Sequence, residues 1–192
     1  MILATNNKGK LKEIREILSE YTIYSLKDKN IDIDVIEDEE TFYGNALKKA
    51  KEIHELTNED VIADDSGLCI ISLNDFPGVL THRFLGENAT DEERNLELIK
   101  KVNNSNDKRA KVVCVLVYYD GKHTIVSEGV LTGTITSTPR GTNGFGFDPI
   151  FEIENGKTLA ELSNDEKNKI SARYLAAIDL KEKIKVLKKK KV

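Results

Sequence analysis

Residues 61–71, which read V-I-A-D-D-S-G-L-C-I-I, place four polar or flexible residues between two apolar runs. The runs at 61–63 and 68–71 are typical of buried strands, whereas the four residues between them favour neither a core nor a regular strand. The interruption therefore predicts a functional site or a tight turn. Because successive side chains of a strand point to opposite faces, only one of Asp64 and Asp65 can face a given pocket unless the backbone kinks. An ordinary Asx turn is the alternative to a catalytic carboxylate.

A length of 192 residues suits one sizeable domain, or two small lobes that share a sheet. Cys69 and Cys114 lie in apolar runs, which predicts small buried side chains rather than a redox pair. The three histidines are isolated and have no ligand-like spacing with these cysteines, which argues against a structural zinc. Any metal ion is therefore expected to be a hard cation bound by oxygen.

The formal net charge is −4, although charged residues make up 32% of the chain. A domain that binds nucleic acid mainly through phosphates is expected to be basic, so the charge argues against that class. The lysine-rich end, residues 181–192, is expected to be the solvated face and frayed end of a helix. No apolar run is long enough to span a membrane, and the sequence starts without a basic, hydrophobic leader, which predicts a soluble cytoplasmic protein with no membrane partner.

The N-terminal segment predicts a buried strand at 1–5, a polar loop with one glycine at 6–10, and then a helix. Backbone N–H groups at such a helix start can bind an anion, and Lys8 and Lys10 add positive charge. The Walker spacing is absent, and a plain helix cap is the favoured alternative.

A second strand is expected at 31–35, where apolar and acidic residues alternate. The acidic run 37–40 then leads to Thr41, a good N-cap. The run favours the helix dipole, and one of its members is a candidate metal ligand. The residues expected to face inward from this helix are Ala46, Leu47, Ala50 and Ile53.

The second half of the chain predicts a helix, a hairpin and a glycine-rich loop. A capping box at 90–93 opens a helix with Leu96 and Ile99 inward. Strands at 110–119 and 124–130 form a hairpin, so the sheet is mixed.

The loop 139–149 carries two phenylalanines among its glycines. It either offers an aromatic face to a flat ligand or buries those rings in the core. A capping box at 163–166 starts the last helix, with Lys167 and Arg173 away from its inner face. The residues expected on the inner face of that helix are Ile170, Tyr174, Ala177 and Ile178.

Six motifs of this chain resemble, in order, those of the inosine and xanthosine triphosphate pyrophosphatases, the Ham1-like family of non-canonical purine nucleoside triphosphate pyrophosphatases. The resemblance runs from about residue 2 to about residue 180. The motifs are T-N-N-K-G-K at 5–10, N-A-L-K-K-A at 45–50, A-D-D-S-G-L at 63–68, P-G at 77–78, G-F-G-F-D-P-I-F at 144–151, and A-E-L at 160–162 leading to E-K-N at 166–168.

The resemblance implies hydrolysis of a nucleoside triphosphate to the monophosphate and pyrophosphate, with Mg²⁺ as cofactor and dITP, ITP and XTP as preferred substrates. It also implies an elongated two-lobed α/β fold on a long mixed sheet flanked by helices, with the active-site cleft between the lobes. Residues 1–192 would form a single catalytic domain, usually part of a homodimer.

The family's site residues map onto this chain motif by motif. The resemblance implies that Asp65 is the catalytic base and a metal ligand, and that Glu37 is the other metal ligand. It places Phe145, Asp148, Lys167 and Arg173 in the base pocket. The full set of substrate-binding residues that it implies is Thr5, Asn7, Lys10, Lys49, Ser66, Phe145, Gly146, Phe147, Asp148, Lys167 and Arg173.

One departure affects the base pocket. Where the family has Ser-His-Arg, this chain has Ala172 in place of the histidine, and it carries His82 where relatives often have alanine. The departure leaves the triphosphate and metal residues in place and concerns the choice of base. Two other readings stay open: a house-cleaning pyrophosphatase for other modified nucleotides, and a nucleotide-sensing module without catalysis.

Overall fold

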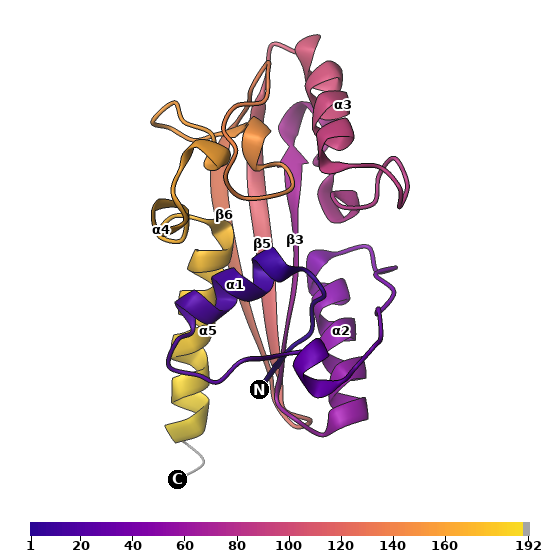
Figure 1. The fold of residues 1–192 in the computed structure, drawn as a ribbon, viewed down its shortest axis with the longest axis vertical. Coiled ribbons are helices and arrows are strands. Elements are labelled where there is room, and N and C mark those ends of the chain that lie inside the picture. The colour runs from indigo at the N-terminus through magenta and orange to yellow at the C-terminus, as the bar shows by residue number, and fades with distance from the viewer. Residues whose placement is uncertain (190–192) are drawn as a thin grey trace. The chain divides into compact units, whose positions relative to one another are not determined.

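The computed structural model describes residues 1–189, and residues 190–192 at the end of the lysine-rich segment lie outside the described part. Its strands form a seven-stranded sheet in the order β2-β1-β3-β5-β6-β7, with β4 paired to β3 (Figure 1). The strands are β1 Ile2–Leu3, β2 Tyr24–Ser25, β3 Val61–Ile70, β4 Phe76–Pro77, β5 Arg109–Tyr119, β6 Thr124–Ile135 and β7 Phe151–Glu152. Since β1 runs parallel to β2 and β3 while β4 and β7 are antiparallel to their neighbours, the predicted mixed α/β sheet is confirmed.

Five α-helices and five short 3₁₀ helices connect the strands in the described part of the chain. The α-helices are α1 Lys8–Ile17, α2 Phe42–Thr57, α3 Asp91–Asn103, α4 Asn164–Lys167 and α5 Ala172–Lys189. The 3₁₀ helices are η1 Lys27–Lys29, η2 Ile71–Leu73, η3 Gly78–Leu80, η4 Asp148–Ile150 and η5 Leu159–Glu161. In the described part, no helix is both long enough and apolar enough to cross a membrane.

The chain forms two compact units, and β3, β5 and β6 each contribute residues to both. The first unit comprises Met1–Asp65, Cys114–Gly129 and the chain from Ala172 onward, and the second comprises Ser66–Val113 and Val130–Ser171. The first unit therefore holds α1, α2 and α5, and the second holds α3, α4 and the glycine-rich loop.

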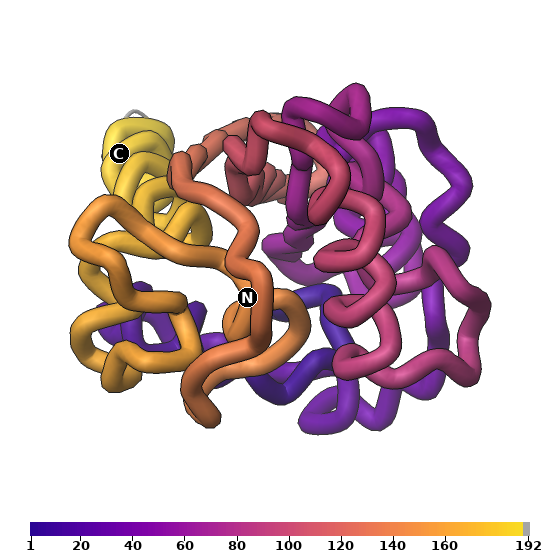
Figure 2. Tube along the Cα trace, turned by 90° about the horizontal axis from the view of Figure 1, so that it is seen from above, coloured from indigo at the N-terminus to yellow at the C-terminus, as the bar shows by residue number. Residues whose placement is uncertain are grey.

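In the first unit, the two faces of β3 carry different helices. Asp64 contacts Lys10 of α1 and Arg173 of α5, whereas Asp65 contacts Asn45 of α2. Because alternate side chains of a strand point to opposite faces, α1 and α5 cover one face and α2 covers the other. In Figure 1 the ribbons of α5 and α2 lie on different sides of the strands, and in Figure 2 the yellow trace of α5 lies apart from the purple trace of α2.

Strand β3 runs through the predicted interruption without a break, and all ten of its residues are buried. Of the two alternatives at 64–67, the turn is therefore wrong. Two adjacent aspartates predict a segment that cannot pack in a core, but ion pairs and a hydrogen bond compensate both carboxylates inside the unit. Buried charges that are paired do not force a strand to end.

The strand predicted at 31–35 is absent, and the segment is irregular. Ile33 is 37% exposed and Ile36 is 71% exposed, while Val35 is buried. The alternation of apolar and acidic residues therefore does not reflect a half-buried strand, because the segment pairs with no strand of the described sheet.

The single helix predicted after residue 163 is two helices. The capping box at Ser163 and Glu166 is present, but α4 ends at Lys167, and α5 starts at Ala172. Because α4 belongs to the second unit and α5 to the first, the break separates Lys167 from Arg173. Ile178 is 36% exposed, and the buried face of α5 comprises Ala172, Arg173, Ala176, Ala177, Leu180 and Ile184.

Other local predictions are confirmed. Thr41 caps α2, and Thr90 with Glu93 forms the capping box of α3. The hairpin of β5 and β6 is present, and both cysteines are buried and free. The expected inward faces of α2 and α3 are right in part. In α2, Ala46, Ala50 and Ile53 are buried, and Leu47 is half-buried. In α3, Ile99 is buried but Leu96 is 49% exposed, and the other buried apolar residues are Leu98 and Val102.

The lysine-rich segment is helical as far as Lys189, where the described chain ends. Two of its lysines, Lys181 and Lys185, pair with Glu20, which follows α1. The predicted helix is confirmed for residues 181–189, and the rest of that prediction lies outside the described residues.

Candidate functional site

The first loop is a helix cap. The Asn7 side-chain Oδ1 accepts hydrogen bonds from the backbone N–H groups of Gly9 at 2.9 Å and Lys10 at 3.1 Å. The Thr5 hydroxyl in turn accepts from the Asn7 N–H at 3.2 Å. The capping oxygen thus satisfies two N–H groups that α1 cannot bond internally. The cap fixes the first turn of α1, from which Lys10 points into the unit.

Four buried charged side chains meet on one face of β3. Lys10 Nζ lies 2.9 Å from Asp64 Oδ2, and Arg173 Nη2 lies 3.5 Å from the same oxygen. Arg173 Nη1 also pairs with Glu13, which stands one helical turn after Lys10 on α1. All four side chains are 10% exposed or less. The group carries two positive and two negative charges, so it is neutral as a set.

These cations keep Asp64 ionised. Burial alone raises the pKa of its carboxyl, but the charges of Lys10, Arg173 and Lys49 outweigh burial and hold that pKa well below its usual range. The second carboxylate oxygen, Oδ1, is buried and makes no hydrogen bond within the described part of the chain. Asp64 is thus a fixed anion that holds two cations.

Asp65 has a different environment. It is 2% exposed, and its Oδ2 accepts a hydrogen bond from the Asn45 amide at 2.8 Å. Burial raises the pKa of its carboxyl, and the negative charge of Glu37 adds to the rise, while Lys49 and Asn45 oppose it, so that the pKa is about 6. A carboxyl with this pKa exchanges a proton near neutral pH, which is the property of a general base.

Lys49 pairs with Glu37 in the same unit. Burial lowers the pKa of the Lys49 ammonium, but the charges of Asp64, Glu37 and Asp65 raise it by more, so Lys49 stays protonated. Its side chain and that of Asn45 lie on the same face of α2, four residues apart. The helix thereby presents a cation and an amide donor to the carboxylates.

The carboxylates of this unit suit a hard metal ion. Glu37 and Asp65 supply only oxygen donors, which Mg²⁺ and Ca²⁺ prefer. Burial and the negative charge of Glu37 raise the pKa of Asp65, and a bound cation would offset that negative charge. Within residues 1–189, however, no cluster of three or more His, Cys, Asp and Glu side chains is already arranged to hold a metal.

The second unit holds another cluster, built on the glycine-rich loop. Asp148 Oδ2 accepts hydrogen bonds from the Phe145 N–H at 2.9 Å and from Lys167 Nζ at 2.7 Å. Lys167 Nζ also lies 4.6 Å from the centre of the Phe145 ring, a cation–π contact. A Cβ on Gly144 would approach Asp148 Oδ2 to 2.0 Å, so this glycine allows the turn to close on the carboxylate. Phe145 and Phe147 are half-buried, which leaves part of each ring accessible.

The structure divides the predicted site residues between the units. The first unit holds Thr5, Asn7, Lys10, Glu37, Lys49, Asp65 and Arg173, and the second holds Ser66, Phe145, Gly146, Phe147, Asp148 and Lys167. Arg173 contacts Glu13 and Asp64 and belongs to a different unit from Lys167 and Asp148, with which the resemblance groups it. Ser66 is buried within β3.

Sequence reasoning missed Glu13 and Asn45. Glu13 follows Lys10 by three residues, and Asn45 precedes Lys49 by four, so helical spacing from a predicted site lysine would have found both. Ala172, which replaces the family histidine, is 2% exposed, and its carbonyl oxygen would lie 2.0 Å from a Cβ on Gly129 of β6. The start of α5 therefore packs closely on that strand.

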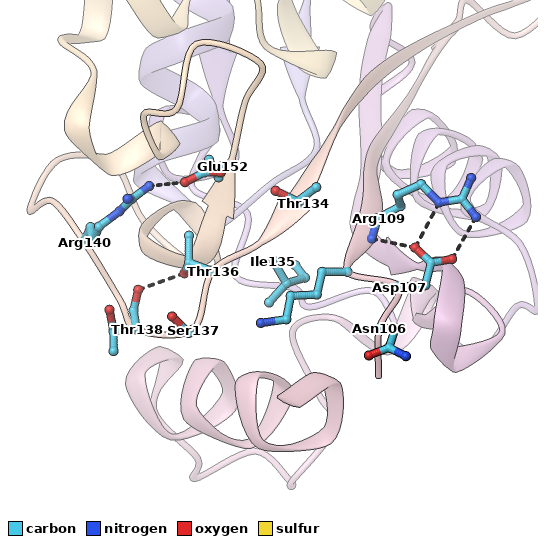
Figure 3. Close-up of a pocket in the computed structure, with 11 residues that line it drawn as sticks. Asn106, Asp107, Arg109, Thr134, Ile135, Thr136, Ser137, Thr138, Arg140 and Glu152 are labelled. Atoms are coloured by element: carbon cyan, nitrogen blue, oxygen red, sulfur yellow. Dashed lines mark hydrogen bonds and ion pairs between the residues drawn. The ribbon is translucent and has the colours of Figure 1, made fainter. Parts of the chain in front are cut away.

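A hollow of about 760 Å³ lies elsewhere in the second unit (Figure 3). It is lined by Asn106, Asp107, Lys108, Arg109, Thr134, Ile135, Thr136, Ser137, Thr138, Arg140 and Glu152. Its two arginines are held by acidic neighbours, Arg109 by Asp107 and Arg140 by Glu152. None of the predicted site residues lines it.

Comparison with known proteins gives the same family throughout. A dITP/XTP pyrophosphatase of Clostridium perfringens (strain 13 / Type A) is 42% identical over 196 residues, which cover 96% of each chain. A dITP/XTP pyrophosphatase of Aquifex aeolicus (strain VF5) is 40% identical over 98% of this chain and 96% of its own.

Among solved structures, the Staphylococcus aureus Ham1 protein matches with a TM-score of 0.87 and 37% identity, and a HAM1 protein from Coxiella burnetii with 0.88 and 36%. Each match covers 96% of this chain and 97% of the other. The profile of the Ham1 family itself matches residues 1–183. With its mixed sheet and its motifs in the expected order, this chain belongs to the Ham1 family.

Proposed function

We propose that this protein hydrolyses non-canonical purine nucleoside triphosphates, namely dITP, ITP and XTP, to the monophosphate and pyrophosphate, and so removes them from the nucleotide pool. Relatives about 40% identical over nearly the full length carry the name dITP/XTP pyrophosphatase. The observation that carries the proposal is Asp65, a buried carboxyl with a pKa of about 6 next to a pair of buried lysines that can bind phosphate.

The first unit would bind the triphosphate. Glu37 and Asp65 are the residues that would hold Mg²⁺. When bound, Mg²⁺ would neutralise phosphate charge and lower the pKa of a bound water. Lys10 and Lys49 would attract the phosphates and neutralise the leaving pyrophosphate.

Asp65 would act as the base. Its carboxylate would accept a proton from the attacking water, whose oxygen forms a bond to the α-phosphorus. The bond from that phosphorus to the bridging oxygen breaks, and pyrophosphate leaves with the electron pair. Most of the rate enhancement would come from positioning and charge neutralisation, because phosphoryl transfer needs little other help from a protein.

The loop cluster of the second unit would bind the base. A keto group at C6 accepts a hydrogen bond where the amino group of adenine donates one, so donors select hypoxanthine and xanthine. Lys167 is such a donor, and the Phe145 ring offers a stacking face. Arg173, which the resemblance places among these donors, is engaged by Glu13 and Asp64, so we assign it to the phosphate side.

We further propose that the whole chain acts as one catalytic domain and works as a homodimer in the cytoplasm, without a nucleic-acid or membrane partner. These proposals follow from the family resemblance and from the acidic net charge. Sedimentation equilibrium that gave the mass of one chain would contradict the dimer.

A substrate panel tests the proposed function directly. Pyrophosphate release should be measured with ITP, XTP, dITP and the ordinary triphosphates, all with Mg²⁺. We expect kcat/KM for ITP, XTP and dITP to exceed that for ATP by at least about 10-fold, because a pocket that forms hydrogen bonds with the base discriminates by that factor or more. Preference for another modified nucleotide would support the house-cleaning alternative. Binding of ITP without release of product would support the sensing module.

Removal of the metal should abolish turnover, and readdition of Mg²⁺ should restore it. With excess chelator we expect no pyrophosphate release above background, and full recovery when Mg²⁺ is in excess over the chelator. A second readout does not need activity: Mg²⁺ should raise the Tm of the wild type by mass action. Glu37→Gln should lose this rise, whereas Glu40→Gln, at an exposed position of the same acidic run, should keep it. An equal rise in both variants would rule out Glu37 as a ligand.

A further inference from the structure

Two side chains of α3 form hydrogen bonds with the backbone N–H and carbonyl groups of Gly146 in the glycine-rich loop. Its N–H donates to Asp91 Oδ2 at 3.1 Å, and its carbonyl accepts from the Asn95 side-chain amide at 2.9 Å. Asp91 and Asn95 are four residues apart, so they stand on the same face of the helix. The two side chains therefore both form hydrogen bonds with the backbone of one loop residue.

The helix itself does not need these two contacts. The capping box of Thr90 and Glu93 already satisfies the start of α3, with the Thr90 hydroxyl accepting from the Glu93 N–H and the Glu93 carboxylate accepting from the Thr90 N–H. Asn95 is only 4% exposed, although asparagine is a poor helix former and costly to bury without a partner. A buried asparagine inside a helix is explained by its bond to Gly146.

Gly146 controls the direction of the aromatic loop. It adopts φ +62°, a left-handed conformation that glycine tolerates best, and it lies between the two phenylalanines. A Cβ at this residue would meet only His82 Cε1, at 3.8 Å, so crowding does not dictate the glycine. The backbone conformation does, and the two hydrogen bonds from α3 fix that conformation.

The preceding residue of the loop, Phe145, is fixed by a separate set of contacts. The Phe145 N–H donates to Asp148, which also holds Lys167 beside the Phe145 ring. With Gly146 held from α3 and Phe145 held through Asp148, the ring and the ammonium have one relative arrangement. A loop rich in glycine would otherwise sample many, at a cost in conformational entropy on binding.

We infer that Asp91 and Asn95 are positioning residues that set the base selectivity of the loop cluster without touching the substrate. The inference rests on the proposed function, because that function makes the loop the binding site of the base. Neither residue belongs to a motif of the family resemblance, and the sequence explains Asp91 only as part of a capping box.

The test compares Asn95→Ala with Thr90→Ala. The second variant weakens the cap of the same helix and is expected to lower Tm by about 2 to 4 °C, without touching the loop. For each protein, kcat and KM are measured with ITP and with ATP. Asn95→Ala should reduce the ratio of kcat/KM for ITP over ATP by about 10-fold, mainly through KM for ITP, because the donors no longer meet the base in one geometry. Thr90→Ala should keep the wild-type ratio.

Hydrogen exchange of residues 144–148 without ligand gives a readout that does not depend on activity. Asn95→Ala should speed exchange in this segment relative to both the wild type and Thr90→Ala. Should Asn95→Ala fail to fold, Asp91→Ala replaces it, because Asp91 is half-exposed. That variant removes the bond to the Gly146 N–H together with an ion pair of 3.6 Å to Arg94.

The outcomes separate the inference from the proposed function. If the wild type releases no pyrophosphate from ITP, the proposed function fails, and exchange alone decides whether α3 positions the loop. If the wild type prefers ITP and Asn95→Ala keeps the wild-type ratio, the inference is overturned, whatever the exchange rate of the loop. A lower ratio in Thr90→Ala equal to that in Asn95→Ala would also overturn it, since the effect would then come from the stability of α3.

Discussion

Replacing Asp65 with asparagine should lower kcat/KM for ITP by about 10³-fold or more, because it removes a general base and a carboxylate that would hold the metal. Asparagine has the same shape, and its side-chain oxygen can still accept the hydrogen bond from Asn45. The variant should therefore fold normally. Pyrophosphate release and circular dichroism measured on the same preparation check both parts of the prediction.

The same variant should be no less stable than the wild type when metal is absent. The folded state raises the Asp65 pKa from 3.8 to about 6, so it favours the protonated carboxyl. Stability from this group is fully present below about pH 4 and is lost as the pH rises through about 6. Above that pH, the wild type should lose on the order of 2 to 3 kcal/mol relative to Asp65→Asn. Urea unfolding at pH 4.5 and pH 7.5, with chelator, measures the difference.

Two results would contradict this account of Asp65. Near-normal turnover in Asp65→Asn would refute the catalytic role. A loss of several kcal/mol in the free energy of unfolding at pH 7.5 would show that the carboxylate stabilises the fold, which is the role that we assign to its neighbour.

Replacing Asp64 with asparagine should mainly lower the free energy of unfolding, whereas Asp65→Asn should mainly lower turnover. It should destabilise the protein by about 3 to 5 kcal/mol, because it leaves the buried Lys10 and Arg173 with one carboxylate, Glu13, between them. The folded state holds the Asp64 pKa well below its usual value, so the stability from this group is present at neutral pH and lost as the pH falls through that lowered pKa. Urea unfolding at pH 7.5 measures the loss.

A double-mutant cycle with Lys10→Met sharpens the test. If the ion pair accounts for the loss, the double variant should be destabilised by less than the sum of the two single variants, since removing both partners leaves no unpaired charge at that pair. Additive losses would mean that Asp64 and Lys10 act independently, against the 2.9 Å contact between them. Asp64→Asn within about 0.5 kcal/mol of the wild type would refute a structural role.

The opposite expectations for adjacent aspartates follow from one property of strands. Alternation sends Asp64 toward the cations of α1 and α5, and Asp65 toward the amide of α2. The sequence alone predicted that the two side chains face different ways, because alternation is local. It did not predict that the strand continues through both of them, since that depends on partners up to 109 residues away.

Capping residues were predictable for a similar reason. Asn7, Thr41, Thr90 and Ser163 each bond N–H groups within three residues of themselves, so the local sequence contains both partners. The strand predicted at 31–35 failed because a strand needs a neighbour, and alternation does not show whether one is present.

The candidate site shows the same limit. Helical spacing joins Glu13 to Lys10, but nothing local joins either to Arg173, which reaches Glu13 across 160 residues. The break between α4 and α5 places Lys167 and Arg173 in different units, although only six positions separate them.

The sequence by itself determined the caps and the hairpin, because the partners of their hydrogen bonds lie close together in the chain. It also contained, in order, the motifs that identify the family. Only the tertiary structure decided which charges neutralise one another: Asp64 with Lys10 and Arg173, Glu37 with Lys49, Asp148 with Lys167. The physical reason is that the energy of a buried charge depends on what surrounds it in space, and those neighbours come from distant parts of the chain.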